Sequence, residues 1–537
     1  MSSPTTEKSP QRSALEDVDT DDTRPPFLLS LTEVKLLGIA GVGFFLDAYD
    51  LFVINPVSTM LQYRLYGGHS LPPHLEGFVK AGANIGSVIG QFAFGYAADA
   101  LGRKAVYGKE LMLIIIATIL TLTTPTGSLS PDGALIYLAM FRILLGVGVG
   151  GDYPMSATIT SDRSNLRKRG TMLAYIFSNQ GWGSFGASLV FIVVLMCYRQ
   201  VMEVQGKVSK VDGVWRIVVG VSLIPAFGTL YQRLTLPEAT RYKKSQEQAR
   251  RLADEEYDID ELKKKNEATV SITEQPQEPS ASASSSDVKT SDSASISAPP
   301  PENKTRQIRE FINYFSEWRH FKILLGTCMC WFLLDIAFYG INLNQNVVLQ
   351  QIGFDGHTGS TAWEKLYRLA VGNIIITALG FVPGYYATIL TVEWLGRKKI
   401  QLMGFLMEAF FLAILAGRFH HLSKPAFIVL FALLQFFFNF GANSTTYIYP
   451  AEVFPTRFKA FAHGMSAACG KAGAIISALV FNTLSKKIGT PAILWIFFGC
   501  SIAGAGFTLL LPEVKMRDAD LIYEEEEKEK RRLQRAS

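Results

Sequence analysis

The sequence predicts an all-α membrane protein with twelve transmembrane helices in two bundles of six. Three observations lead to this prediction. Hydrophobic residues make up 48% of the 537 residues, and the mean hydropathy is +0.19. Apolar runs of about 18–25 residues, each long enough to cross a bilayer as a helix, recur along most of the chain. One long polar stretch separates six of these runs from the other six.

The twelve runs are centred near residues 47, 88, 115, 146, 184, 224, 335, 379, 410, 437, 471 and 501. They divide the chain into a tail (1–34), a six-helix bundle (35–236), a polar loop (237–321), a second six-helix bundle (322–511) and a second tail (512–537). The loop is rich in serine and charge, so we expect it to be largely disordered. Kinases or the ubiquitin machinery are the partners expected to act on it.

Basic residues cluster in short loops beside the apolar runs, at 103–104, 167–169, 397–399 and 528–535. The loop at 128–133 has no lysine or arginine. By the positive-inside rule, both termini and the loops that follow even-numbered spans are cytoplasmic. Because each cluster is short and adjoins a span, we expect no nucleic-acid binding. The expected setting is therefore a lipid bilayer.

Two aspartates, Asp47 and Asp50, lie in the middle of the first apolar run. A carboxylate at membrane depth costs about 2.5–3.5 kcal/mol on insertion scales. A spacing of three residues places both on one helix face, where we expect a cavity and a use for their protons. Arg142 in the fourth run needs an acidic partner, and Asp47, Asp50 and Asp152 are the acids available in this half. The pattern indicates ion-coupled transport.

In the seventh run, Trp331, Asp335 and Tyr339 recur every four residues and so form one stripe. An acid between two aromatic residues in a span favours a lined cavity. Lys471, in the eleventh run, is costly at that depth unless it faces a cavity or an acid. No nucleophile and base pair, metal-ligand spacing or nucleotide loop appears. We expect no enzyme activity, no cofactor and no metal ion.

The two halves share motifs. Asp99 is followed by Gly-Arg103-Lys, and Glu393 by Gly-Arg397-Lys, with two residues between the acid and the glycine in each case. The spacing lets each acid pair with its arginine and latch the helix ends together. Both halves also end in Leu-Pro-Glu. The first motif resembles the signature of the major facilitator superfamily, whose members contain repeats of six helices around a site at the membrane midplane.

A closer resemblance follows from longer stretches. Residues 150–157 read Gly-Gly-Asp-Tyr-Pro-Met-Ser-Ala, and similar agreement occurs at 43–50, 178–183, 441–446 and 470–473. They resemble the phosphate:proton symporter family of fungi and plants. The sequence departs from that family at Ala442 and Met155, and neither change removes a polar group.

This resemblance implies transport of inorganic phosphate with protons across the plasma membrane by alternating access. The residues implied to bind phosphate are Tyr153, Gln180, Trp331, Asp335, Tyr339, Asn443 and Lys471. Those implied for proton coupling are Asp47, Asp50, Arg142 and Asp152. A glycerophosphodiester:proton symporter and a phosphate receptor remain alternatives, although the bulk of Trp331 and Tyr339 favours the smaller substrate.

Overall fold

A computed structural model describes residues 24–247, 251, 304–356 and 359–536, and regular structure in these ranges is entirely helical. The first half contains α1 (Leu31–Phe52), α2 (Ile54–Leu65), α3 (Pro73–Leu101), α4 (Arg103–Val106), α5 (Lys109–Leu122), α6 (Pro131–Arg163), α7 (Arg169–Cys197), α8 (Val211–Gly220) and α9 (Leu223–Leu234). The second half contains α11 (Lys304–Ser316), α12 (Trp318–Asn342), α13 (Gln345–Gln351), α14 (Ala362–Ile376), η3 (Thr377–Phe381), α15 (Val382–Leu395), α16 (Arg397–Arg418), α17 (Lys424–Asn439), α18 (Ala442–Val453), α19 (Lys459–Ile488) and α20 (Thr490–Thr508). A final helix, α21 (Ala519–Ala536), follows.

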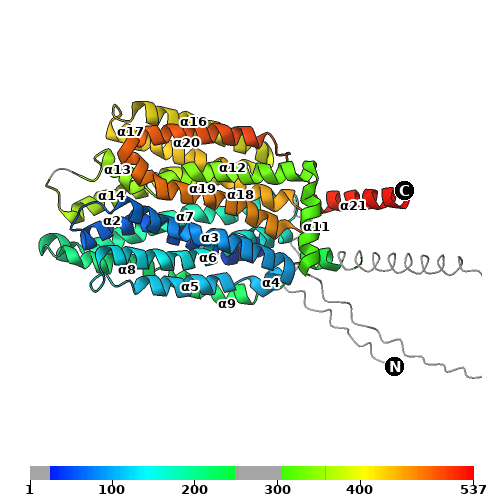
Figure 1. Ribbon diagram of the computed structural model, residues 1–537, viewed down its shortest axis with the longest axis horizontal. Coiled ribbons are helices and arrows are strands. Elements are labelled where there is room, and N and C mark those ends of the chain that lie inside the picture. Colours follow the sequence, from blue (N-terminus) through cyan, green and yellow to red (C-terminus); the bar gives the residue numbers. More distant parts are fainter. Residues whose placement is uncertain (1–23, 248–250, 252–303, 357–358, 537) are drawn as a thin grey trace, which may run out of the picture.

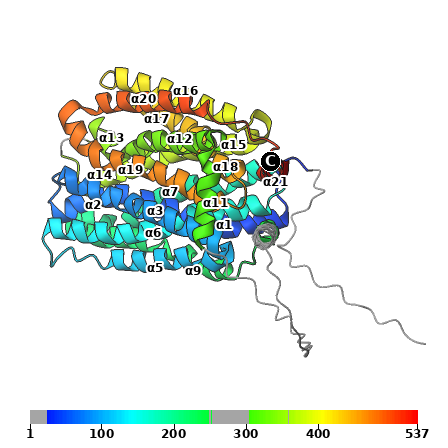
Figure 2. The ribbon, with the colours of Figure 1, turned by 45° about the vertical axis from the view of Figure 1, so that its right-hand side comes forward.

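The long helices run side by side, with the first half forming one layer and the second half the other (Figure 1). The halves meet where α3 lies along α19 and where α7 lies along α14 and α15. Helix α11 lies across one end of the long helices, and Figure 2 shows the same arrangement from a second direction. We call this end the α11 end, and the opposite end, where α2 and α13 lie, the α13 end.

Eleven helical segments among the described residues are long and apolar enough to cross a membrane. The twelfth predicted run, centred near residue 88, corresponds to α3, which has 29 residues. This helix is rich in glycine and carries buried polar side chains such as Lys80, Asn84 and Gln91. It lies between α6 and α19, so protein surrounds much of its polar surface. All twelve predicted centres fall within these segments.

The paired Gly-Arg-Lys and Leu-Pro-Glu motifs meet in space. Glu238 accepts a hydrogen bond from the backbone N–H of Lys104 at 3.0 Å, at the start of α4. Glu513 accepts from the backbone N–H groups of Arg397 and Lys398 at 3.0 and 3.1 Å, at the start of α16. Each glutamate therefore satisfies N–H groups that a helix start leaves unpaired.

The glycines of these turns, Gly102 and Gly396, have φ values of +94° and +86°. Only glycine adopts this region without strain. A Cβ atom on Gly396 would also lie 2.5 Å from the carboxylate of Glu513.

Much of the predicted loop lies outside the described residues, so the expectation of disorder there stays a prediction. The described part includes α11, whose Phe311 and Phe315 contact Phe458 and Phe454 of the second half. Helix α11 therefore belongs to the packed structure, although the sequence alone placed it in the loop.

Candidate functional site

Lys471 lies where the two halves pack against each other, which we call the seam. Its ammonium donates to the hydroxyl of Tyr339 at 2.6 Å and lies 3.3 Å from Oδ2 of Asp335. The ammonium also lies 5.0 Å from the ring centroid of Tyr153, which comes from the first half. All four side chains are buried. The ammonium charge of Lys471 is thus stabilised by the acid of Asp335, the hydroxyl of Tyr339 and the ring faces of Tyr153 and Tyr339.

Trp331 forms the wall of this site. Its ring centroid lies 6.3 Å from that of Tyr153. Gly470 lies directly against the indole, because a Cβ atom there would come within 2.5 Å of Trp331 and 3.0 Å of Asp335. The glycine that precedes Lys471 therefore lets α19 approach α12 closely enough to bring the lysine to the acid.

The remaining two residues assigned to phosphate, Gln180 and Asn443, form an adjoining polar group with Tyr385. The hydroxyl of Tyr385 donates to Oε1 of Gln180 at 2.6 Å, and Nδ2 of Asn443 donates to the Tyr385 hydroxyl at 2.8 Å. The ring of Phe177 connects the two groups, since it lies 5.8 Å from Tyr385 and 6.4 Å from Tyr153. The sequence analysis missed Tyr385, because it is one of 20 tyrosines in the chain and lies in an apolar run.

The four residues assigned to proton coupling are not paired as the sequence suggested. Arg142 donates to the backbone carbonyls of Val79 and Asp50, at 3.1 and 3.2 Å, and not to a carboxylate. Asp47 and Asp50 are buried. No ion pair within 4 Å joins either acid to a cation in the described ranges. These two carbonyls, from α3 and from the end of α1, lie within hydrogen-bond distance of the guanidinium and accept from it in place of an acid.

Asp152 instead forms a two-pronged ion pair with Arg233 of α9, at 3.1 and 3.0 Å. The same guanidinium lies 3.2 Å from Oε1 of Glu110 in α5. All three groups are buried. The sequence analysis missed Arg233 and Glu110, because each lies near the end of an apolar run. A charged residue there is usually one that flanks a span at the membrane surface. Two carboxylates share one guanidinium here, so the cluster contains one more carboxylate than cation.

Gly43 leaves the space for this cluster. A Cβ atom on Gly43 would lie 1.5 Å from Nη2 of Arg233 and 2.1 Å from Oδ2 of Asp152. Gly43 is four residues before Asp47 on α1, so the ion pair packs one turn away from an acid that has no ion-pair partner in the described ranges.

We predict that Gly43→Ala destabilises the protein and reduces transport. Alanine is favoured over glycine within a helix by about 0.5–1 kcal/mol, but overpacking costs about 1–3 kcal/mol and displacing a buried ion pair adds to that cost. The measurement is the midpoint of thermal unfolding in detergent, beside transport activity. Gly38→Ala is the matched control on the same helix, because a Cβ atom there meets nothing within 4 Å. If both variants unfold at the same temperature, the packing argument for Gly43 is wrong.

At the α11 end, the paired motifs connect the two halves. Asp99 and Arg103 lie 3.2 Å apart, and Asp99 also accepts from the backbone N–H groups of Ala460 and Phe461, at the start of α19 in the other half. A further ion pair between the halves joins Lys459 to Asp162 at 2.9 Å.

The second motif makes an equivalent contact in the opposite direction. Arg397 forms paired hydrogen bonds with Glu393, at 2.7 and 3.1 Å, and with Glu452, at 2.7 Å each. Glu393 accepts from the backbone N–H of Thr171, at the start of α7 in the first half. Each half therefore holds the other at the α11 end.

The α13 end is also bridged. Lys80 of α3 is paired with Glu76 at 2.6 Å and donates to Oδ1 of Asn344, in the second half, at 2.9 Å. The indole N–H of Trp363 donates to the carbonyl of Leu195 at 2.9 Å. Since contacts between the halves exist at both ends, the Lys471 site is enclosed.

Comparison with known proteins identifies the family. The family model described as "Sugar (and other) transporter" matches residues 36–525. The chain belongs to this family. It is 44% identical to a putative inorganic phosphate transporter of Schizosaccharomyces pombe, over 95% of this chain and 91% of that protein. It is 36% identical to the inorganic phosphate transporter PHO84 of Saccharomyces cerevisiae, over 96% of this chain and 87% of that protein.

A solved structure confirms the predicted fold. The proton:xylose symporter XylE, a major facilitator superfamily protein, superposes with a TM-score of 0.65 at 19% identity. The match covers 91% of this chain and 98% of XylE. The chain therefore has the major facilitator fold. Its family, its relatives and its apolar helices make it a multi-pass membrane transporter and not an enzyme.

Proposed function

We propose that this transporter imports inorganic phosphate together with protons, by exposing the Lys471 site alternately at the two ends. The observation that carries the proposal is the ammonium of Lys471, enclosed in the seam between Tyr339 and Asp335. An anion can replace part of the contact with Asp335 and supply the countercharge that the lysine needs. The names of the relatives, which are inorganic phosphate transporters, support phosphate as this anion.

Phosphate would be held mainly by uncharged donors. The group proposed to bind it comprises Tyr153, Gln180, Trp331, Asp335, Tyr339, Asn443 and Lys471. Hydroxyl, amide and indole groups donate to phosphate oxygens, while the protons of dihydrogen phosphate can be donated to a carboxylate. Asp335 therefore suits dihydrogen phosphate, either by accepting from it or, when protonated, by donating to it.

Protons would be taken up by Asp47 and Asp50, which have no ion-pair partner among the residues that the structure describes, with Arg142 and Asp152 on the same route. Coupling has an energetic reason. A thousandfold inward gradient costs about 4 kcal/mol, and an anion entering against the potential costs about 2.3 kcal/mol per 100 mV. One proton makes the step electroneutral, and more than one turns the potential into a driving force.

The contacts at the α11 end would act as gates. The pairs Asp99–Arg103 and Glu393–Arg397 hold backbone N–H groups of the opposite half. Opening this end must break these hydrogen bonds, so their strength sets how readily phosphate leaves.

The proposed setting is the plasma membrane, with both termini and the α11 end in the cytoplasm. The proposed organisation is two six-helix bundles, 35–236 and 322–511, joined by a cytoplasmic loop at 237–321. Kinases and the ubiquitin machinery would act on that loop. The basic clusters beside the spans support this orientation.

Substrate identity is tested by equilibrium binding of radiolabelled phosphate to the purified protein, in competition with glycerophosphodiesters. We expect inorganic phosphate to displace the label and glycerophosphocholine to compete poorly, because Trp331 and Tyr339 fill the space around Lys471. Equal competition by the diester would contradict phosphate as the preferred substrate. Binding without any uptake in vesicles would favour a receptor.

A further inference from the structure

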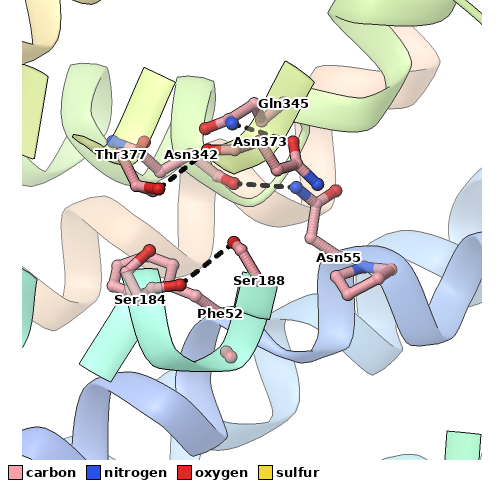
Figure 3. A pocket seen from close by; sticks show the side chains of 10 residues that line it. Phe52, Asn55, Ser184, Ser188, Asn342, Gln345, Asn373 and Thr377 are labelled. Carbon is pink, nitrogen blue, oxygen red and sulfur yellow. Dashed lines mark hydrogen bonds between the residues drawn. The ribbon is translucent and has the colours of Figure 1, made fainter. Parts of the chain in front are cut away.

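A small cavity lies between the two halves, with Gln345 of α13 in its wall (Figure 3). Its volume is about 20 Å³, which is room for about one water molecule. The wall contains Phe52, Asn55 and Ser188 from the first half, and Gln345, Asn373 and Thr377 from the second. Any separation of the halves at the α13 end therefore enlarges this cavity.

The polar groups of the wall are uncharged, and they are paired with one another or with their neighbours. Gln345 donates to Oδ1 of Asn373 at 2.8 Å, and Asn373 donates to Oδ1 of Asn346 at 2.8 Å. Asn346 then donates to the hydroxyl of Thr59, in the first half, at 3.0 Å. This series of hydrogen bonds crosses the seam. It must break when α2 and α13 move apart, and the released amides then need new partners.

One aromatic layer separates the cavity from Lys471. Phe52, which lines the cavity, stacks on the ring of Tyr339 with centroids 5.9 Å apart and planes inclined by 17°. Phe381 lies edge-on to Phe52 at 6.2 Å. Tyr339 is the residue whose hydroxyl accepts from Lys471. The cavity and the buried Lys471 site thus lie one after the other, with Phe52 and Tyr339 between them.

We propose that this cavity is an outer phosphate-binding site, which the ion occupies before it passes Phe52 and reaches Lys471. The inference rests on the proposed function. Amides and hydroxyls can donate to phosphate oxygens and accept from its protons. On opening, phosphate replaces the partners that the amides lose, so none of these groups is left buried and unsatisfied. On closing, the amides bond each other again and the site shrinks, which releases the ion inward.

The test places a negative charge in the wall without changing its shape. Asn373→Asp and Gln345→Glu are the two variants, so that a failure of one to fold leaves the other. The probe is radiolabelled inorganic phosphate, with initial rates measured in intact cells and in inside-out vesicles from the same cells. Like charges repel, so the KM for uptake from the α13 end should rise by at least about tenfold. The KM from the α11 end should stay at the parent value.

Gln401→Glu is the matched control. Gln401 is a buried amide that donates to Thr508 at 3.0 Å, between α16 and α20 within the second half. A KM increase in one direction only, in the wall variants and not in the control, supports the outer site. An equal change in both directions, or no change in folded wall variants, overturns it and leaves the cavity as a water site or part of the gate. Absence of phosphate transport by the parent would instead overturn the proposed function.

Discussion

Asp47→Asn is expected to abolish uphill accumulation of phosphate while the protein still folds and reaches the membrane. The carboxylate of Asp47 is buried and has no ion-pair partner in the described part of the chain. Replacing it with an amide of nearly the same shape therefore breaks no pair and removes only the titrating group. The same reasoning applies to Asp50→Asn. The measurement is phosphate accumulation under an imposed pH gradient, normalised to protein at the cell surface.

The matched control for this prediction is Glu408→Gln. Glu408 is also a buried acid, but it lies between α16 and α20, where Ser501 is its hydrogen-bond partner at 3.5 Å. We expect this variant to accumulate phosphate like the parent. Normal accumulation by both Asp47→Asn and Asp50→Asn would remove the proposed proton route. Failure of Glu408→Gln as well would show that any buried acid is required, and so would not support a specific route.

Lys471→Ala is expected to weaken phosphate binding by about 10- to 150-fold, because a hydrogen bond to a charged group contributes about 1.5–3 kcal/mol. Asp335→Asn keeps a polar group beside the lysine but cannot change protonation, so binding should survive while release or coupling fails. The measurement is equilibrium phosphate binding between pH 5 and 8, beside uptake. If the Asp335→Asn variant transports phosphate with the same pH dependence as the parent, Asp335 does not change protonation during the transport cycle.

Loss of stability must be separated from loss of binding in Lys471→Ala, since removing one partner of a buried pair costs about 3–5 kcal/mol. Lys459→Ala provides the comparison, because Lys459 and Asp162 form a buried lysine–aspartate pair away from the site. Both variants should unfold at a lower temperature, and only Lys471→Ala should lose phosphate affinity. Equal loss of affinity in the two variants would indicate a general effect of destabilisation.

The sequence predicted the parts of the site that depend on local spacing. Trp331, Asp335 and Tyr339 share a helix, so their spacing of four residues was enough to place them on one face. Asp99 and Arg103 have the same spacing, and their ion pair is present. The run centred near residue 88 was predicted from its length, although α3 is rich in glycine and carries buried polar residues. These polar residues suit a helix that is surrounded by protein.

The parts that depend on contacts between distant helices could not be predicted. Arg142 was expected to pair with an acid, but it donates to backbone carbonyls of α3 and α1 instead. Arg233 pairs with Asp152 across 81 residues of sequence, and no spacing rule connects them. Tyr385 bonds to Gln180, which itself accepts from Asn443 at 3.3 Å, because α15 lies beside α7. Such contacts follow from the packing of the two halves, which a single sequence does not specify.

Phosphate uptake by the purified protein in proteoliposomes tests the central claim most directly. The vesicles receive an imposed inward proton gradient, and radiolabelled phosphate is followed over time, with an uncoupler added in a parallel sample. We predict accumulation above the external concentration, and collapse of that accumulation when the uncoupler dissipates the gradient. Phosphate that only equilibrates across the membrane, with the same course in both samples, would contradict proton-coupled import.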